Sequence, residues 1–269
     1  MKDKILLFIP MYNCEKQIVR VLKQLDKEVL NFISQVIIVN NRSTDNSQQA
    51  AIDYLKNNPS LPAKVLLNNE NYNLGGSHKV AFQYAIKNNF DYVVVLHGDD
   101  QGQIQDLLPL LKSKEYRNYD CFLGARFMKG SKLQGYSKFR IFGNYVFNLL
   151  FTIVLGKSIK DLGSGLNMYK TEILKSGFYN KYPDSLLFNY CMIMGADYYK
   201  HKIKFFPILW REEDQVSNVK LTSQAFTVLN LLLFYFVSKK KFIQAEYRQK
   251  ALSDYTAEVV FSRESYEKI

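Results

Sequence analysis

Four short apolar runs that alternate with helical patterns constrain the fold of this chain more than any other feature. The runs cover Lys4 to Ile9, Gln35 to Val39, Lys64 to Leu67 and Val93 to Leu96. Helical patterns follow the first three runs, over about residues 15–25, 47–56 and 79–88. This alternation predicts a doubly wound α/β sheet with a site at the carboxyl ends of its strands.

The run from Val93 to Leu96 ends abruptly in the sequence HGDDQ, residues 97–101. A β-branched run of this kind is typical of a central strand that helices cover on both faces. Polar loops after residues 9, 39 and 96 should therefore converge at one edge of the sheet. Two adjacent carboxylates there indicate a divalent-cation site with Asp99 as its first ligand. The alternative is that Gly98 and the aspartates only form a turn at the strand exit.

The composition is that of one large domain, or one domain with a tail, in a chain of 269 residues. A formal net charge of +11 favours anionic partners such as phosphorylated substrates or anionic lipid. No nucleic-acid motif accompanies this charge, so nucleic acid is not an expected partner. Cys14, Cys121 and Cys191 are widely spaced and indicate neither a disulfide framework nor a metal site. Together with the lack of a signal peptide before the first strand, they favour a cytoplasmic location.

Four motifs in the first half of the chain resemble, in order and spacing, those of family 2 glycosyltransferases. They are IPMYNCE (residues 9–15), VNNRSTDNS (39–47), NLGG (73–76) and HGDDQ (97–101). Later motifs resemble the acceptor half of the dolichol- and polyprenyl-phosphate sugar synthase branch: GARF (124–127), Arg140, DLGSG (161–165) and WREEDQVSNVK (210–220). The resemblance covers roughly residues 4–220. It implies the GT-A fold, with a doubly wound mixed sheet and helices on both faces, and a nucleotide-diphosphate sugar donor.

The resemblance also implies which residues contact the donor and a Mn²⁺ or Mg²⁺ ion. Asp99 and Gln101 correspond to metal-ligand positions, and His97 stands where the family has its first aspartate. An imidazole ligand suits manganese better than magnesium, or else His97 contacts only the sugar-phosphate. The implied nucleotide-sugar-binding residues are Pro10, Tyr12, Asn13, Glu15, Asn40, Asn41, Gly76 and Asp99. Their alternative role is turn formation after the strands.

Acceptor binding by the same resemblance involves three arginines and two serines: Arg126, Arg140, Arg211, Ser164 and Ser217. The residues expected to act in catalysis are Asp99, Asp161, Arg126 and Arg211. If polyprenyl phosphate is the acceptor, no catalytic base is obligatory, because a phosphate is already ionised. If the acceptor is a sugar hydroxyl of a polysaccharide or glycolipid, a base must come from Asp161, Glu212, Glu213 or Asp214. A third reading is a non-catalytic scaffold with a decayed site.

Two apolar stretches, Phe142 to Leu155 and Phe226 to Val237, bear on the location of the protein. Neither reaches the length of about 20 residues that a membrane-spanning helix needs. Lys239, Lys240 and Lys241 follow the second stretch, which favours peripheral association with an anionic membrane surface at the cytoplasmic, inner face. A core helix or a contact in a homo-oligomer is the alternative. We therefore expect a GT-A domain over residues 1–220 and a helical C-terminal extension over 221–269.

Overall fold

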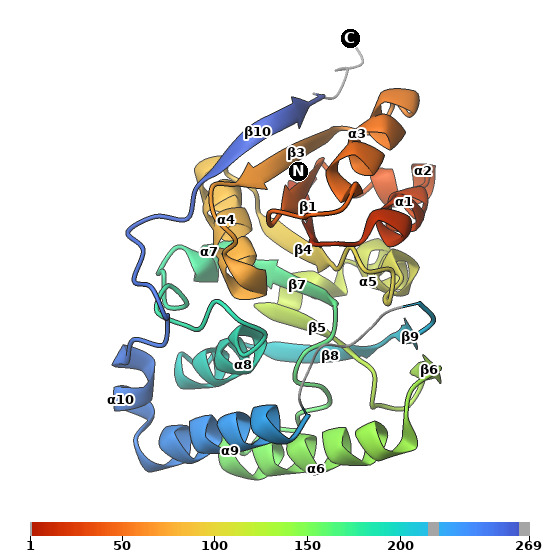
Figure 1. Cartoon of the computed structure of the whole chain (residues 1–269). Helices are drawn as coiled ribbons and strands as arrows, with labels where there is room; N and C mark the ends of the chain where they lie inside the picture. The colour runs from red at the N-terminus through yellow and green to blue at the C-terminus, as the bar shows by residue number, and fades with distance from the viewer. Residues whose placement is uncertain (1, 215–220, 264–269) are drawn as a thin grey trace.

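A mixed sheet of eight strands forms the centre of the molecule in the computed structural model, which describes residues 2–214 and 221–263. The strand order across the sheet is β10-β3-β2-β1-β4-β7-β5-β8 (Figure 1). The strands are β1 (Ile5–Met11), β2 (Gln35–Asn40), β3 (Ala63–Asn68), β4 (Tyr92–Leu96), β5 (Cys121–Ala125), β7 (Leu166–Lys170), β8 (Ile203–Pro207) and β10 (Ala257–Ser262). All four strands expected from the apolar runs are therefore confirmed.

Strand directions divide the sheet into a parallel half and a mixed half. β3, β2, β1 and β4 are parallel to one another. β7 runs antiparallel to both β4 and β5, and β5 is parallel to β8. The parallel half places the ends of β1, β2 and β4 at one edge, as the expected site requires, and the mixed sheet confirms the fold class.

Helices cover both faces of the sheet, as the buried strands predict. One core lies under α1 (Glu15–Lys23), α2 (Lys27–Leu30), α3 (Ser47–Asn57) and α5 (Leu108–Ser113). The opposite core lies under α4 (Asn73–Lys87), α6 (Lys138–Leu155), α7 (Thr171–Leu174), α8 (Phe188–Tyr198), α9 (Leu221–Val237) and α10 (Lys239–Gln244). Alternate β1 residues serve the two cores: Leu6 and Phe8 face one, Leu7 and Ile9 the other. Two short strands, β6 (Lys132–Gln134) and β9 (Leu209–Arg211), pair beside this sheet.

The C-terminal segment is helical only in part, which corrects the expectation of a helical extension over residues 221–269. After α10 the chain runs back along the molecule, and β10 adds an antiparallel strand to the edge of β3 (Figure 1). Val259, Val260 and Phe261 have the β-branched and aromatic side chains that favour strands. Their backbone also satisfies the groups that the edge of β3 would otherwise leave unpaired.

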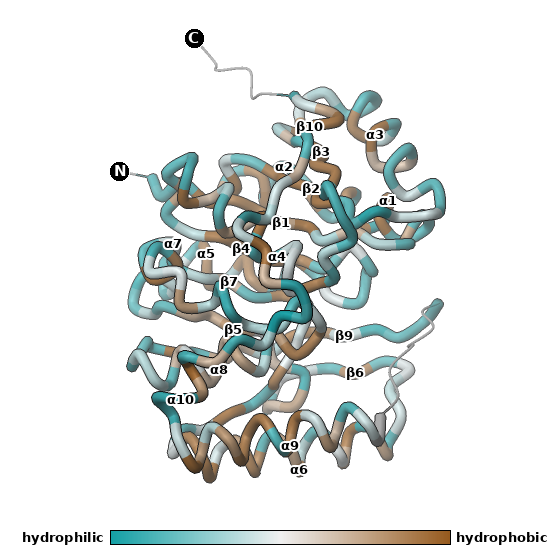
Figure 2. Tube along the Cα trace, turned by 60° about the vertical axis from the view of Figure 1, so that its left-hand side comes forward, coloured by the Kyte–Doolittle hydropathy of each residue, from teal (hydrophilic) through white to brown (hydrophobic). Residues whose placement is uncertain are grey.

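Helices α6 and α9 lie side by side at one end of the molecule and present an apolar surface, which we call the α6/α9 face (Figures 1 and 2). Its exposed side chains are Phe139, Phe142, Tyr145, Val146, Leu149, Ile153, Phe226, Leu229, Leu233, Phe234, Phe236 and Val237. Residues 226–237 are a core helix on one face, where Val228, Leu232 and Tyr235 are buried, and are exposed on the other. By length and composition alone, the 18 residues of α6 are enough to cross a membrane, which also corrects the expectation for this stretch.

Candidate active site

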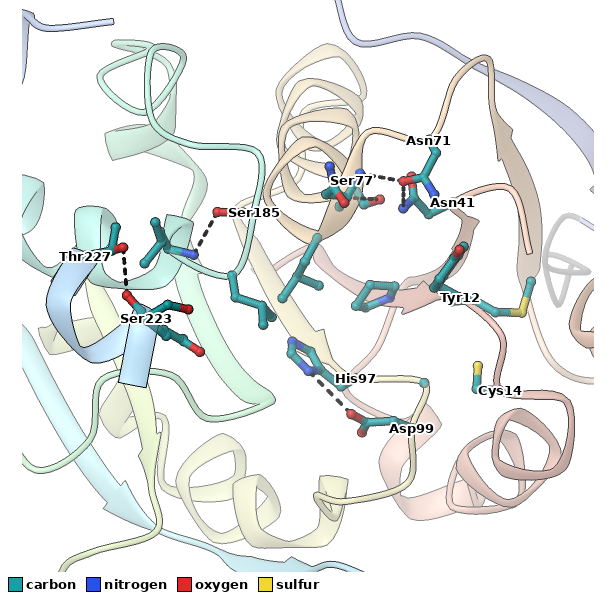
Figure 3. Close-up of a pocket in the computed structure, with 18 residues that line it drawn as sticks. Tyr12, Cys14, Asn41, Asn71, Ser77, His97, Asp99, Ser185, Ser223 and Thr227 are labelled. Carbon is teal, nitrogen blue, oxygen red and sulfur yellow. Dashed lines mark hydrogen bonds and ion pairs between the residues drawn. The ribbon is translucent and has the colours of Figure 1, made fainter. Parts of the chain in front are cut away.

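A cavity of about 690 Å³ lies at the carboxyl edge of the parallel strands, where the sequence places the site (Figure 3). It is lined by Asn41 after β2, by residues 97–99 after β4, and at the end of β1 by Pro10, Met11, Tyr12 and Cys14. The walls are completed by residues 185–187, the start of α9, and four residues before and within α4: Asn71, Asn73, Leu74 and Ser77. The predicted convergence of the three loops is thus confirmed. We call this the first cavity.

The residues expected to bind the nucleotide sugar divide into two groups. Pro10, Tyr12, Asn41 and Asp99 line the first cavity, and the side chain of Tyr12 is 50% exposed. The remaining four, Asn13, Glu15, Asn40 and Gly76, do not line it.

These four residues instead hold the loops around the first cavity. The Asn13 carboxamide oxygen accepts a bond from the backbone of Thr44 at 2.8 Å, and the Asn40 oxygen accepts one from the backbone of Ser43 at 2.9 Å. The backbone nitrogen of Glu15 donates to Asp45 at 3.1 Å. Gly76 faces the side chains of Tyr72 and Tyr255.

Asn41 is buried, and its carboxamide is fully engaged within the protein. Its oxygen accepts bonds from the Asn68 side chain at 3.0 Å and from the backbone nitrogen of Tyr72 at 2.8 Å. Its nitrogen donates to the Asn71 carboxamide oxygen at 2.8 Å (Figure 3). An aspartate could not donate that last bond. The asparagine therefore orders residues 68–72, which carry Asn71 into the cavity wall.

His97 and Asp99 lie together in the first cavity, with the Nδ1 of His97 4.0 Å from a carboxylate oxygen of Asp99 (Figure 3). Burial lowers the pKa of His97 to about 4, so its imidazole is neutral at pH 7 and can act as a ligand. Burial also raises the pKa of Asp99 to about 6. Gln101, the third expected ligand, is not among the residues that line the cavity.

The two side chains fit a metal that completes its coordination with phosphate oxygens. Among the described residues, no group of three or more His, Cys, Asp or Glu side chains could enclose an ion. Mg²⁺ in particular is usually held by one or two carboxylates together with substrate phosphates. An ion between His97, Asp99 and a bound diphosphate agrees with that pattern.

Asp100 does not line the first cavity, and its carboxylate joins the loop after β4 to α1 and to β9. Its backbone has a positive φ of 59°, and its carboxylate accepts bonds from Arg20 at 2.7 Å and Gln24 at 2.9 Å, both near the end of α1. Arg211 of β9 donates to the same carboxylate at 3.2 Å. Arg211 is thus paired with Asp100 and lies outside the lining of the first cavity.

A second cavity of about 360 Å³ adjoins the first and shares Leu74, His97, Leu186 and Gln224 with it. Its walls are mostly apolar and come largely from α6 and α9, with Arg126 and Arg140 as the cationic side chains. The structure therefore brings these two expected acceptor-binding arginines to one place. The third, Arg211, does not line this cavity either.

Both arginines of the second cavity are held by carboxylates. Arg126 binds Asp161 through two parallel bonds of 2.8 and 2.7 Å, a geometry that fixes the plane of the guanidinium. Arg140 donates to Glu212 at 2.6 Å.

The carboxylates proposed as bases do not line either cavity. Asp161 pairs with Arg126, and Glu212 pairs with Arg140. Asp214 pairs with Arg20 at 2.8 Å, and Glu213 is exposed. Among the described residues that line the two cavities, Asp99 is the one carboxylate.

The two expected acceptor-binding serines are not part of these cavities in the described structure. Ser164 is buried and donates to the backbone of Leu166 at 3.2 Å. Ser217 lies outside the described residues.

Several lining residues were not expected from the sequence. They are Asn71, Asn73, Leu74, Ser77, Ser185, Leu186, Leu187, Ser223, Gln224 and Thr227. Asn71 belongs to the Asn-rich turn before NLGG, which is a recognisable signal. Leu186 and Gln224 lie in segments without a motif, and only the fold brings them to the boundary of the two cavities.

Comparison with protein families gives a match to the family model described as "Glycosyl transferase family 2" over residues 7–178. An undecaprenyl-phosphate mannosyltransferase of Micrococcus luteus is 25% identical over 173 residues, which are 64% of this chain and 69% of that protein. An uncharacterized protein of Methanocaldococcus jannaschii is 25% identical over 174 residues, 65% of this chain and 68% of that protein.

Solved structures share the fold at low sequence identity. Glucosyl-3-phosphoglycerate synthase from Mycobacterium tuberculosis, in complex with Mn²⁺, UDP and phosphoglyceric acid, has a TM-score of 0.62 at 13% identity. That alignment covers 98% of this chain and 90% of the other. S. aureus TarS 1-349 in complex with UDP-GlcNAc has a TM-score of 0.57 at 18% identity, covering 86% of this chain and 66% of TarS 1-349.

Proposed function

Because this chain belongs to glycosyl transferase family 2, as its motifs predicted, we propose that it transfers a sugar from a nucleotide-diphosphate donor to polyprenyl phosphate. The donor occupies the first cavity and the acceptor phosphate the second. One observation carries the choice of acceptor: the second cavity is an apolar space that contains two arginines and, among its described lining residues, no carboxylate.

The chemistry of the two cavities matches a phosphate nucleophile. An oxygen of the acceptor phosphate attacks the anomeric carbon, the bond from that carbon to the donor diphosphate breaks, and the nucleoside diphosphate leaves with the electron pair. Attack from the face opposite the leaving group inverts the anomeric configuration. Arg126 and Arg140 hold the phosphate, which needs no base because it is already ionised near pH 7.

Asp99 and His97 are the residues that would hold a divalent cation. Bound there, Mn²⁺ or Mg²⁺ would neutralise the charge that develops on the departing diphosphate. A complex of a structural neighbour with Mn²⁺ and UDP supports this assignment. The M. luteus relative, named for its action on undecaprenyl phosphate, supports the acceptor class.

The α6/α9 face would bring the second cavity to a lipid surface. Both ends of α6 are bonded to the same domain: Arg140 near its start donates to Glu212, and Lys157 just after its end pairs with Asp197 of α8. A helix held in this way lies along the domain and cannot cross a bilayer while the domain is folded. We therefore place the protein peripherally on the inner face of the membrane, with α6 and α9 in the interfacial region.

A donor and acceptor screen tests the proposal. Purified protein with Mn²⁺ or Mg²⁺ would be given a panel of nucleotide sugars, with either short-chain polyprenyl phosphate or an oligosaccharide as acceptor. We expect transfer to the polyprenyl phosphate. Transfer to the oligosaccharide alone would assign the enzyme to hydroxyl acceptors.

Gly143 offers a matched pair of variants, because it lines the second cavity and a Cβ placed on it meets no atom within 4 Å. Gly143→Phe should fill the cavity and lower kcat/KM for the lipid acceptor at least tenfold, whereas Gly143→Ala should stay near the wild type. Both changes improve helix propensity, so the fold should tolerate them. Equal activity of the two variants would remove the second cavity as the acceptor site.

A further inference from the structure

A segment that the proposed chemistry does not use, residues 245–256, runs from α10 back to the sheet edge, and we call it the strap (Figure 1). The strap contacts two loops that line the first cavity, the loop that contains Asn71 and the loop that contains residues 185–187. Thr256 accepts bonds from the backbone and the side chain of Asn69 at 3.1 and 2.8 Å, just before the lining residue Asn71. Tyr255 reaches the second loop, at Asp184.

Lys79, Asp184 and Tyr255 form a buried cluster beneath that second loop. The side chain of Lys79 is completely buried, and its ammonium donates to Asp184 at 2.7 Å, to the backbone oxygen of Tyr182 at 2.6 Å and to the Tyr255 hydroxyl at 3.2 Å. The Tyr255 hydroxyl donates to the same Asp184 oxygen at 2.8 Å. A buried ammonium is stable only when paired and hydrogen-bonded in this way.

Gly75 binds the backbone of Asp184, whereas Lys79 and Tyr255 bind its side chain. Its backbone nitrogen donates to the Asp184 backbone oxygen at 2.6 Å. A Cβ on Gly75 would lie 2.5 Å from the Pro183 oxygen, so only glycine permits this approach of the loop to α4. The NLGG motif thus brings a helix and a loop together.

The residues after Asp184 form the boundary between the two cavities. Ser185, Leu186 and Leu187 line the first cavity, and Leu186 also lines the second although its side chain is 46% exposed. An exposed leucine has little packing of its own to hold it. Its position therefore depends on the anchored residue two places earlier.

We propose that Lys79, Asp184 and Tyr255 act as a positioning lock, which fixes residues 185–187 between donor and acceptor and keeps water from the donor. In this lock Tyr255 is a positioning residue, since it does not line the first cavity and bonds to Asp184 beside it. The exclusion of water rests on the proposed function. The ordering of the loop by the strap does not.

The strap supplies a matched pair of variants for the test. Tyr255→Phe keeps the ring beside Lys79 and removes two bonds of the hydroxyl, the one it donates to Asp184 and the one it accepts from Lys79. Tyr247→Phe removes a hydroxyl bond from the strap to the Phe242 backbone oxygen in α10, away from Asp184. Hydrogen exchange of residues 184–188 is measured first, and this readout needs neither donor nor acceptor.

We expect Tyr255→Phe to speed exchange of these amides at least about tenfold, because the loss of a single hydrogen bond to a charged group has about that effect. Tyr247→Phe should leave the exchange unchanged even if both variants melt at a lower temperature. With nucleotide sugar and polyprenyl phosphate together, Tyr255→Phe should also raise the ratio of donor hydrolysis to transfer. Unchanged exchange in Tyr255→Phe, or an equal change in both variants, would overturn the lock.

If Tyr255→Phe exchanges faster but the hydrolysis ratio stays constant, the loop is ordered by the strap without guarding the donor, which overturns the water-exclusion part. Should Tyr255→Phe fail to fold, Asp184→Asn gives the same exchange readout, because an amide keeps one acceptor oxygen but loses the charge that binds Lys79. Protection of residues 184–188 equal to the wild type in Asp184→Asn would also overturn the proposal.

Discussion

Burial shifts the pKa values of His97 and Asp99 in opposite directions, because it disfavours the charged form of each. His97 titrates at about 4 and is neutral throughout the physiological range. Asp99 titrates at about 6 before any metal binds, so it holds a proton over a range where an ordinary aspartate is ionised. A metal bound at the proposed site would therefore compete with a proton on Asp99.

The affinity for Mn²⁺ should fall about tenfold for each pH unit below 6, because one proton must leave Asp99 before the metal binds. Above pH 6 the affinity should be nearly constant, since the carboxylate is already ionised. Calorimetric titration of Mn²⁺ in the presence of a nucleoside diphosphate, from pH 5 to 8, measures this. Constant affinity down to pH 5 would contradict the assignment of Asp99 as a ligand.

His97→Asp should move metal preference from Mn²⁺ toward Mg²⁺, because it exchanges a nitrogen ligand for an oxygen ligand. The ratio of turnover with Mg²⁺ to turnover with Mn²⁺ is the measurement. Gln101→Ala is the control and should keep the wild-type ratio, since Gln101 does not line the cavity. A His97→Asp protein that is inactive with both metals would show that the imidazole has another role.

For individual residues, the position relative to a strand predicted which side chains reach the cavity better than the residue type did. His97 and Asp99 reach the cavity because they follow β4, and this could be inferred from the sequence. The partners of Asp100 could not, since Arg20 and Arg211 lie 80 and 111 residues away. Gly76 was assigned to donor binding by its motif, but the packing of Tyr255 against it depends on a strap that carries no signal.

Among the elements, the four parallel strands were predictable because each is an apolar run that is buried in the sheet. β10 was not predicted although Val259, Val260 and Phe261 favour a strand, because its side chains are mostly exposed and its partner β3 is far away along the chain. The start of α4 was also missed: the helix begins at Asn73, while the pattern predicted Lys79. Gly75 and Gly76 have low helix propensity, so the sequence pattern did not predict the first turns of α4, which tertiary contacts stabilise.

Asp197 links the elements of the apolar end of the molecule. Its carboxylate accepts bonds from Tyr235 of α9 at 2.7 Å, Lys239 of α10 at 2.9 Å and Lys157 after α6 at 3.1 Å. Burial opposes ionisation of Asp197, but these bonds outweigh it and hold its pKa below the usual value. Lys239 is thus engaged in the protein, although the sequence assigned it to membrane binding.

Asp197→Asn should lower the free energy of unfolding at pH 7 by about 2 kcal/mol, the range for hydrogen bonds to a charged group. Because the folded-state pKa is lowered, this stabilisation is complete above about pH 4 and is lost as the pH falls further. The difference in Tm between wild type and variant should therefore shrink from pH 7 to pH 3. Glu172→Gln, which removes an exposed ion pair with Lys175, is the control and should barely change Tm.

For the whole molecule, we propose that the formal charge of +11 and the α6/α9 face together favour binding to a membrane surface. The sequence identified the two apolar stretches and the lysines after the second. It could not show that the stretches pack side by side, since about 70 residues separate them along the chain. That pairing produces one broad apolar surface beside the second cavity.

Phe142→Ser combined with Leu233→Ser should weaken binding to anionic vesicles about a hundredfold. These side chains are 67% and 60% exposed, and moving each into lipid is worth roughly 1.5 to 3 kcal/mol. Vesicle flotation at low and high salt measures the effect. Val259→Ser on β10, where the side chain is 55% exposed at the sheet edge, is the matched control and should bind as the wild type does.

Lys240→Gln with Lys241→Gln should remove mainly the salt-sensitive part of vesicle binding, because charge attraction to anionic lipid is screened by salt while apolar insertion is not.

Sedimentation of the wild type and the double serine variant without vesicles distinguishes a membrane-binding surface from an oligomer contact. If the wild type is a dimer that the double serine variant dissociates, and neither protein floats with vesicles, then a second copy of the chain covers the α6/α9 face. If the wild type floats as a monomer and the serine variant does not, the face binds lipid.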